Sequence, residues 1–137
     1  DIAVLSVETV PDKFHSRLNA VKKTYLYRIE MGPKKDVFER KYCYGLGKPL
    51  SVKRMEEAAA CVLGEHDFKS FCGNKKMKKS TVTTMSDITG TLIEIGLGER
   101  SPQEMKEILL KLDRQAAGFT APPEGLFLER VMYEDRE

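Results

Sequence analysis

The sequence is poor in residue types that support several classes of protein. Its 137 residues contain no Trp, three Cys and two His. Cys43, Cys61 and Cys72 lie far apart and form no Cys-x-x-Cys pair, which excludes a disulfide scaffold and is typical of reduced thiols in a cytoplasm. Structural zinc sites bring their ligands in close pairs, and His15 and His66 supply none, so we expect no metal.

Long apolar runs and a strong net charge are also absent. The longest uninterrupted apolar run, residues 58–63, has six residues, whereas a membrane-spanning helix needs about 20. The net charge of +2 is too small to indicate a polyanionic partner by itself. The opening residues lack the features of a secretory signal and do not begin with Met. We therefore expect a cytoplasmic piece of a longer protein that does not enter a membrane.

Apolar residues at helical spacing predict two helices. Residues 52–63 carry the first, with Ser51 and Gly64 as cap candidates. Residues 102–113 carry the second, which opens with the capping-box pattern S-x-x-E at 101–104. Both helices present an apolar stripe, so we expect them to pack against another element.

Strands are predicted toward both ends of the chain. Residues 2–10 are rich in β-branched types and predict a buried strand, residues 23–31 alternate with a period of two, and residues 125–133 predict a final strand. We therefore predict a single α+β domain over residues 1–137, with an antiparallel or mixed β-sheet and helices packed on one face.

Residues 80–88 do not fit this pattern. Their β-branched content predicts a strand, yet they run directly into the apolar residues 89–95. No turn of the usual length of about 4 to 6 residues separates the two. The junction between Ile88 and Thr89 is therefore a candidate for a missing segment.

Basic residues are clustered although the net charge is small. Residues 69–79 contain five lysines and no acid. Such a cluster is either a solvated surface or a phosphate contact surface, because ammonium groups that replace condensed counterions supply the sequence-independent part of nucleic-acid affinity. Tyr25 and Tyr27 lie beside Lys22, Lys23 and Arg28. This interleaving is typical of a stacking platform for bases, although core packing of one tyrosine is the simpler interpretation.

Several motifs resemble those of bacterial tRNA pseudouridine synthase A. Residues 10–29, V-P-D-K-F-H-S-R-L-N-A-V-K-K-T-Y-L-Y-R-I, resemble the family pattern F-H-A-R-x-x-A-x-x-[RK]-x-Y-x-Y at the start of its second half. Residues 55–71 are similar to a family helix that ends in G-x-H/N-D-F-x-S-F, residues 90–96 to its G-T-L-I-E-I-G segment, and residues 121–133 to its closing A-x-x-G-L-x-L-x-x-V-x-Y. The resemblance covers most of the chain in order and implies the C-terminal half of the pseudouridine synthase fold.

The resemblance implies an isomerase that converts uridines in the anticodon arm of tRNA into pseudouridine without a cofactor. In the family the target base is flipped out of its stack. An aspartate acts as nucleophile, the glycosidic bond breaks, and the uracil rejoins through carbon. The first Tyr of Y-x-Y lies beside the base, and that position is Tyr25 here.

The resemblance also suggests further RNA contacts and an assembly. His15 and Arg17 come from the F-H-S-R motif and are candidates for placing RNA, as are the nearby lysines. The family enzyme is a homodimer whose tRNA contacts both subunits. The candidate RNA-contacting residues are thus His15, Arg17, Lys22, Lys23, Lys75, Lys76, Lys78 and Lys79.

Two departures from the family pattern limit what this chain can do alone. The family's nucleophilic Asp stands in G-R-T-D-A-G, and no Asp here follows Arg-Thr. The family also places a strand and an M-V-R helix start before G-T-L-I-E-I-G, which suggests that roughly 25 residues are missing at the Ile88–Thr89 junction, since no connecting turn remains there. We therefore expect an inactive fragment, with a non-catalytic RNA-binding module or a protein-interaction domain as alternatives.

Overall fold

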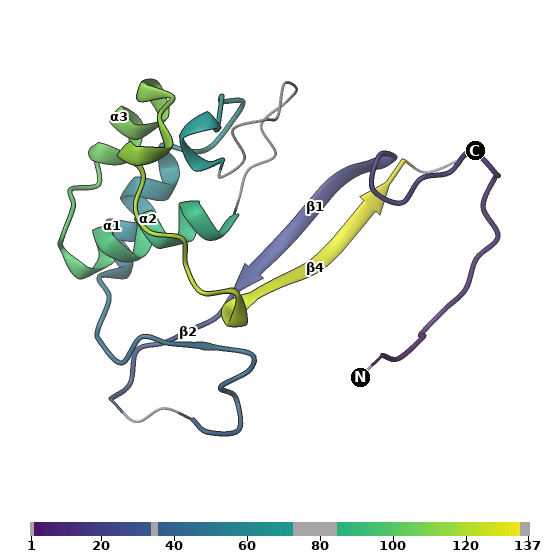
Figure 1. Ribbon diagram of the computed structural model, residues 1–137, viewed down its shortest axis with the longest axis horizontal. Coiled ribbons are helices and arrows are strands. Elements are labelled where there is room, and N and C mark those ends of the chain that lie inside the picture. Colours follow the sequence, from purple (N-terminus) through teal and green to yellow (C-terminus); the bar gives the residue numbers. More distant parts are fainter. Residues whose placement is uncertain (1, 34–35, 73–84, 135–137) are drawn as a thin grey trace. The chain divides into compact units, whose positions relative to one another are not determined.

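The computed structural model describes residues 2–33, 36–72 and 85–134. The chain divides into two compact units: Asp1–Tyr25 with Leu128–Glu137, and Leu26–Phe127. The described residues combine α-helices with small sheets (Figure 1). The prediction of an α+β fold is therefore confirmed.

Two long strands form the main sheet. β1 (Ala20–Tyr27) pairs with β4 (Leu126–Tyr133), and their arrows run in opposite directions in Figure 1. The predicted final strand over residues 125–133 is thus confirmed to within one residue. Both strands are rich in β-branched and aromatic side chains, which suit a pleated, half-buried surface.

The predicted strand over residues 23–31 starts earlier and is interrupted at Arg28. The Arg28 N–H donates to the Gly125 carbonyl at 2.9 Å, and the Arg28 carbonyl accepts from the Tyr44 N–H at 2.9 Å. The backbone therefore changes partners at this residue. A short parallel pair follows, between β2 (Ile29–Glu30) and β3 (Tyr44–Gly45).

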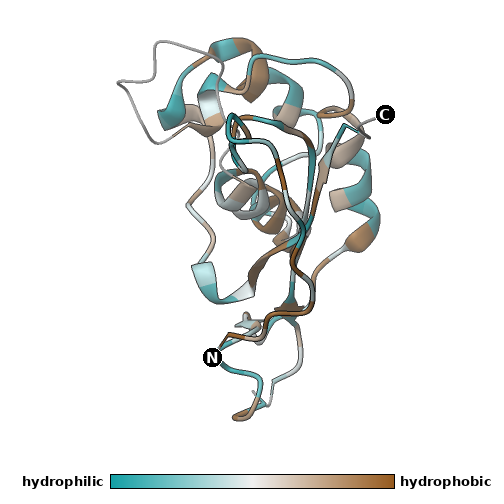
Figure 2. Cartoon of the chain, turned by 90° about the vertical axis from the view of Figure 1, so that its right-hand side faces the viewer, coloured by the Kyte–Doolittle hydropathy of each residue, from teal (hydrophilic) through white to brown (hydrophobic). Residues whose placement is uncertain are grey.

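The prediction of a buried strand over residues 2–10 is wrong. No element is assigned there, and Ile2 and Leu5 are each 95% exposed. The segment beginning at the N label is coloured mostly as hydrophobic in Figure 2. A strand requires a neighbour to accept and donate its ladder hydrogen bonds, and composition does not supply that neighbour.

Helices make up most of the unit Leu26–Phe127. Ser51 caps the first helix by accepting a hydrogen bond from the Arg54 N–H, as predicted, but the helix ends three residues before 63. The Ser101 N–H donates to the Glu104 carboxylate at 2.8 Å, which is one half of the predicted capping box. The helices are α1 (Val52–Ala60), α2 (Met85–Leu97) and α3 (Glu104–Lys111), with 3-10 turns η1 (Lys69–Phe71), η2 (Arg114–Ala116) and η3 (Pro123–Gly125).

Helix α2 corrects the prediction of a strand over residues 80–88. Residues 85–88 form its first turn, and residues 80–84 lie outside the described residues. Because Ile88 and Thr89 are consecutive helical residues, no turn is required between them. Asp87 in the first turn lies where the helix dipole favours a negative charge.

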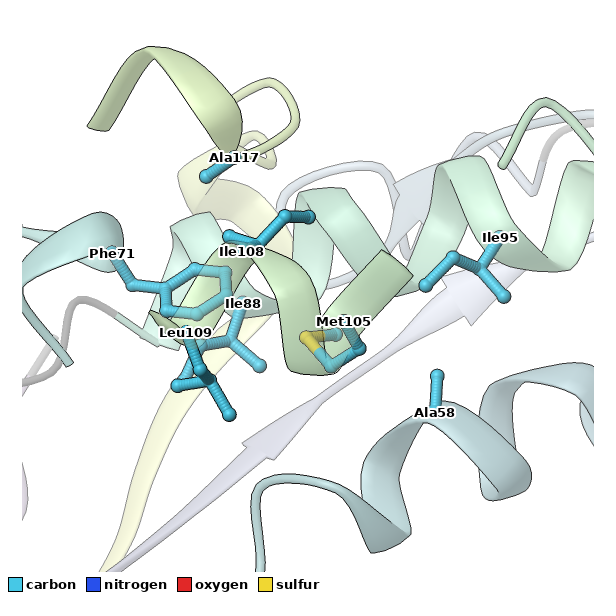
Figure 3. Packing of buried hydrophobic residues seen from close by; sticks show 8 residues of the cluster. All are labelled: Ala58, Phe71, Ile88, Ile95, Met105, Ile108, Leu109 and Ala117. Carbon is cyan, nitrogen blue, oxygen red and sulfur yellow. The ribbon is translucent and has the colours of Figure 1, made fainter. Parts of the chain in front are cut away.

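The core of this unit lies among α1, α2, α3 and η1. Figure 3 shows apolar side chains from these elements converging, with the Phe71 ring directed toward Ile88 and Leu109. Phe71, Ile95 and Met105 are fully buried. Burying a side chain of this size stabilises a fold by about 1.5 to 3 kcal/mol. The other members of the cluster are Ala58, Ile108 and Ala117.

Candidate nucleic-acid interface

The unit Asp1–Tyr25 with Leu128–Glu137 carries most of the predicted RNA-contacting residues that the structure describes. Tyr25 lies on β1 and is 38% exposed, so its ring is accessible to solvent. Successive residues on a strand point to opposite faces, which places Lys23 on the same face as Tyr25 and Lys22 on the other. Both lysines are exposed. An accessible ring with a cation two residues away can stack on a base and attract its phosphate.

The F-H-S-R motif forms a turn that is attached to β4. The Tyr133 hydroxyl donates to the Ser16 carbonyl at 3.0 Å. The Tyr133 ring also meets the Phe14 ring edge to face, with centroids 5.0 Å apart. An edge-to-face aromatic pair contributes about 0.5 to 1.5 kcal/mol beyond its buried area. The motif is therefore held against the strand that pairs with the Tyr25 strand.

His15 has a structural role inside this turn. Its Nδ1 accepts hydrogen bonds from the Arg17 N–H at 3.2 Å and the Leu18 N–H at 3.4 Å. Its backbone N–H donates to the Asn19 side chain at 2.7 Å. These bonds close the turn around the His15 ring. The exposed Arg17 side chain remains available to solvent at the tip of the turn.

Tyr27 is a supporting residue, in agreement with the simpler interpretation of the two tyrosines. Its hydroxyl donates to the Pro122 carbonyl at 2.5 Å. Its ring fits against Gly125, where an added Cβ would come within 2.9 Å of the ring. Burial, reinforced by Tyr44 and Glu124, raises the pKa of Tyr27 to about 12. A phenol held this firmly as a neutral donor is unsuited to proton abstraction.

The four remaining candidate RNA contacts lie outside the described residues, and two other polar residues, Asp67 and Arg100, have structural roles. Lys75, Lys76, Lys78 and Lys79 all lie outside the described residues. Asp67 accepts a hydrogen bond from the Lys69 N–H at 3.0 Å, as expected for a turn residue. Arg100 forms an ion pair with Glu94 of α2 and donates a hydrogen bond to the Ala116 carbonyl of η2, so it connects these two elements.

The structure also shows a cavity that sequence reasoning missed. It has a volume of about 260 Å³, and Glu30, Asp36 and Glu124 contribute carboxylates to its lining. Burial, together with the charges of Glu30 and Glu39, raises the pKa of the Cys43 thiol at its wall. A thiol in such surroundings is a poor nucleophile. The first and last lining residues, Glu30 and Glu124, are 94 positions apart in the sequence. No local sequence pattern could therefore indicate this cavity.

The structure adds two observations on metals and membranes. Within residues 2–33, 36–72 and 85–134, no three His, Cys, Asp or Glu side chains are grouped in a way that could hold a metal ion. In the same residues, every helix is too short or too polar to cross a bilayer.

Comparison with known proteins gives a partial match to one family. A family model described as tRNA pseudouridine synthase matches residues 86–134, which include α3, β4 and all of α2 except Met85. The match covers 49 of the 137 residues, and the α+β fold is consistent with the pseudouridine synthase fold.

Curated relatives with the name tRNA pseudouridine synthase A are similar to nearly the whole chain. The chain is 35% identical over 161 residues to tRNA pseudouridine synthase A of Bacillus licheniformis, with 98% of this chain and 65% of the relative covered. It is 38% identical over 161 residues to the enzyme of the same name from Bacillus subtilis, with the same coverage. For Halalkalibacterium halodurans the identity is 39% over 156 residues, with 95% and 59% covered. The chain is thus similar to tRNA pseudouridine synthase A over nearly its whole length, and it spans 59 to 65% of the length of these relatives, which is less than two thirds.

Proposed function

We propose that this chain is part of a tRNA pseudouridine synthase that isomerises uridine in the anticodon arm and acts in the cytoplasm. Similarity to known proteins carries the proposal, because relatives that match 98% of the chain have the name tRNA pseudouridine synthase A. The solvent-accessible ring of Tyr25 is compatible with it. In this role the ring stacks on the flipped uracil, and the phenol assists removal of the proton from carbon 5.

The chemical step requires a nucleophile from outside these 137 residues. The family's G-R-T-D-A-G motif does not occur in the sequence. An aspartate that forms the covalent bond to the substrate cannot be replaced by binding contacts alone, so the chain by itself should bind RNA without converting it. His15, Arg17, Lys22 and Lys23 would then contribute to placing the RNA, together with the lysines of residues 75–79.

A missing segment next to α2 is part of the proposal. The two Bacillus matches extend over 161 residues although the chain has 137, so the relatives contain residues that have no counterpart here. The family model begins to match at residue 86, and α2 runs without a break through Ile88 and Thr89. We propose that the missing segment lies on the N-terminal side of α2, near but not at the Ile88–Thr89 junction that the sequence alone suggested.

A homodimer is also proposed, on physical grounds. Residues 2–10 expose apolar side chains to solvent, and their backbone forms no strand in this chain. Unpaired backbone next to β-branched side chains readily pairs with another chain. Covering this segment in a larger polypeptide or in an assembly would remove that apolar surface from water.

The role of Tyr25 is tested in the complete polypeptide that the reading frame encodes. Tyr25→Phe should retain tRNA binding and lower kcat by about 10²- to 10⁴-fold, as expected for loss of a positioned acid–base group. Met132→Leu is the control, since Met132 lies on the paired strand and is 44% exposed. Release of tritium from 5-tritiated uridine in tRNA gives the rate. An unchanged kcat for Tyr25→Phe would contradict the proposal.

A further inference from the structure

The turn formed by residues 36–42 presents two aromatic side chains to solvent. Phe38 is 87% exposed and Tyr42 is 47% exposed. Single exposed apolar residues are ordinary on protein surfaces and need no explanation. Two aromatics on one short turn, close to further aromatic and basic groups, form a surface with a definite chemistry.

The second part of this surface is a stack of rings and cations. The Tyr42 and Phe127 ring centroids are 6.4 Å apart with an interplanar angle of 33°. The Arg28 guanidinium carbon lies 5.0 Å from the centroid of the Phe127 ring, a cation–π arrangement. Arg40 and Lys41 are exposed on the turn itself. The Phe127 ring therefore has the Tyr42 ring and the Arg28 guanidinium as neighbours, and Tyr42 belongs to the same turn as the cations Arg40 and Lys41.

The turn is held in shape by its own hydrogen bonds. The Asp36 carboxylate accepts from the Phe38 N–H at 2.8 Å and the Glu39 N–H at 3.4 Å. The Arg40 guanidinium donates to the Val37 carbonyl at 2.9 Å, and the Glu30 carboxylate accepts from the Asp36 N–H at 3.0 Å. A preorganised backbone lowers the entropy that is lost when an exposed ring engages a ligand.

We propose that this surface, made of Arg28, Phe38, Arg40, Lys41, Tyr42 and Phe127, binds unpaired nucleotides of RNA. Bases stack on the Phe38 and Tyr42 rings, and Arg40 and Lys41 contact the adjoining phosphates. The inference rests on the proposed function for the presence of an RNA substrate, and it adds a second contact surface that is distinct from the residues around Tyr25. A protein partner would use the same rings but would not require cations between them.

The acidic residues of the turn allow a test in which one substitution should strengthen RNA binding instead of weakening it. Glu30 and Asp36 direct their carboxylates to backbone N–H groups of the turn, whereas the exposed Glu39 adds a negative charge beside Arg40 and Lys41. If phosphates bind here, Glu39 repels them. Replacement of Glu39 by glutamine should then strengthen binding, an effect that loss of a structural residue would not produce.

The probe is a fluorescently labelled single-stranded oligouridylate, bound to the 137-residue chain at several salt concentrations. Phe38→Ala should weaken binding by about 5- to 150-fold, the usual range for loss of one stacked base, without changing the salt dependence. Lys41→Gln should lower the slope of log affinity against log salt by about 0.7, as expected for one phosphate contact on a single strand. Glu39→Gln should raise the affinity.

Matched control variants distinguish the loss of a stacking ring from the loss of any exposed side chain. Leu63→Ala removes another exposed apolar side chain of the same unit, and Glu57→Gln removes an exposed acid on α1; neither should change binding. Tyr42→Ala should weaken binding as Phe38→Ala does, and an unchanged circular dichroism melt shows that each variant is folded.

Two results would overturn the inference. One is failure of the chain to bind oligouridylate at low salt, and the other is unchanged affinity of Phe38→Ala and Tyr42→Ala. If the surface binds another protein instead of RNA, the second result is expected. The proposed function is tested separately by the kcat of Tyr25→Phe, so either proposal can fail while the other stands.

Discussion

Individual side chains in this molecule differ sharply in what their surroundings allow them to do. Tyr25 and Tyr27 lie two positions apart on one strand. Tyr25 is exposed, whereas the Tyr27 hydroxyl is hydrogen-bonded and its ring packs against Gly125. Strand alternation predicts that both point to one face and cannot distinguish them, because Gly125 is nearly a hundred positions away in the sequence. The family resemblance singled out Tyr25, and the fold supplies the physical reason why Tyr27 is a structural residue.

The first prediction concerns the pH dependence that Tyr27 introduces. Its pKa is about 12 in the folded chain and about 10 when unfolded. Since the folded state holds the proton more tightly, its contribution to the free energy of unfolding is complete below pH 10 and is lost as the pH rises from about 10 to 12. Urea denaturation across this window should show the loss. Tyr27→Phe should flatten the decline, and an equally steep decline in that variant would contradict the assignment.

The second prediction concerns the buried carboxylate of Asp87. It is 1% exposed and accepts from the Arg114 guanidinium at 2.8 Å and from the Thr120 hydroxyl. Breaking a buried ion pair by removing one partner costs about 3 to 5 kcal/mol, because the other charge is left without compensation. Arg114→Met should therefore lower the free energy of unfolding by that amount in chemical denaturation.

A more exposed ion pair provides the control. Arg100 and Glu104 approach to 3.6 Å, and the Glu104 side chain is partly exposed. Glu104→Gln keeps the acceptor for the Ser101 N–H and should cost less than about 1 kcal/mol. Equal losses for Arg114→Met and Glu104→Gln would show that burial does not determine the energetics here.

At the scale of elements, the predictions that were confirmed rest on local signals. Helix α1 starts after Ser51 because the cap and the apolar stripe are both contained in a short stretch of sequence. The prediction over residues 2–10 was wrong because a strand needs a partner strand, which a local pattern does not supply. The strand predicted over 80–88 was wrong in its final residues, since β-branched content does not exclude a helix that tertiary packing stabilises. Local patterns thus predict capped helices better than strands.

The third prediction tests the close approach between α2 and the chain that follows η2. A Cβ added at Gly90 would come within 1.7 Å of the Phe119 carbonyl oxygen. Alanine favours an isolated helix over glycine by about 1 kcal/mol, but here the clash must move backbone. Gly90→Ala should therefore lower the melting temperature, as measured by circular dichroism. Lys106→Ala on the exposed side of α3 is the control and should change it little; a stabilised Gly90→Ala variant would contradict the packing.

At the scale of the whole molecule, our proposal assigns RNA-binding surfaces to this chain and the nucleophile to residues outside it. It spans about 65% of the length of its Bacillus relatives, and the motif that carries the family's nucleophile is absent from its sequence. The sequence could predict Tyr25 and the F-H-S-R turn as candidates because both lie within short motifs. It could not predict the aromatic surface around Phe127, since Arg28, Tyr42 and Phe127 meet only after folding.

The central claim is that the attacking carboxylate comes from outside these residues. The most direct measurement incubates the purified 137-residue chain with unmodified tRNA and quantifies pseudouridine by mass spectrometry after nuclease digestion, with Bacillus subtilis tRNA pseudouridine synthase A as the positive control. The account predicts tRNA binding and no pseudouridine from the chain alone. Conversion of uridine by the chain alone would contradict it.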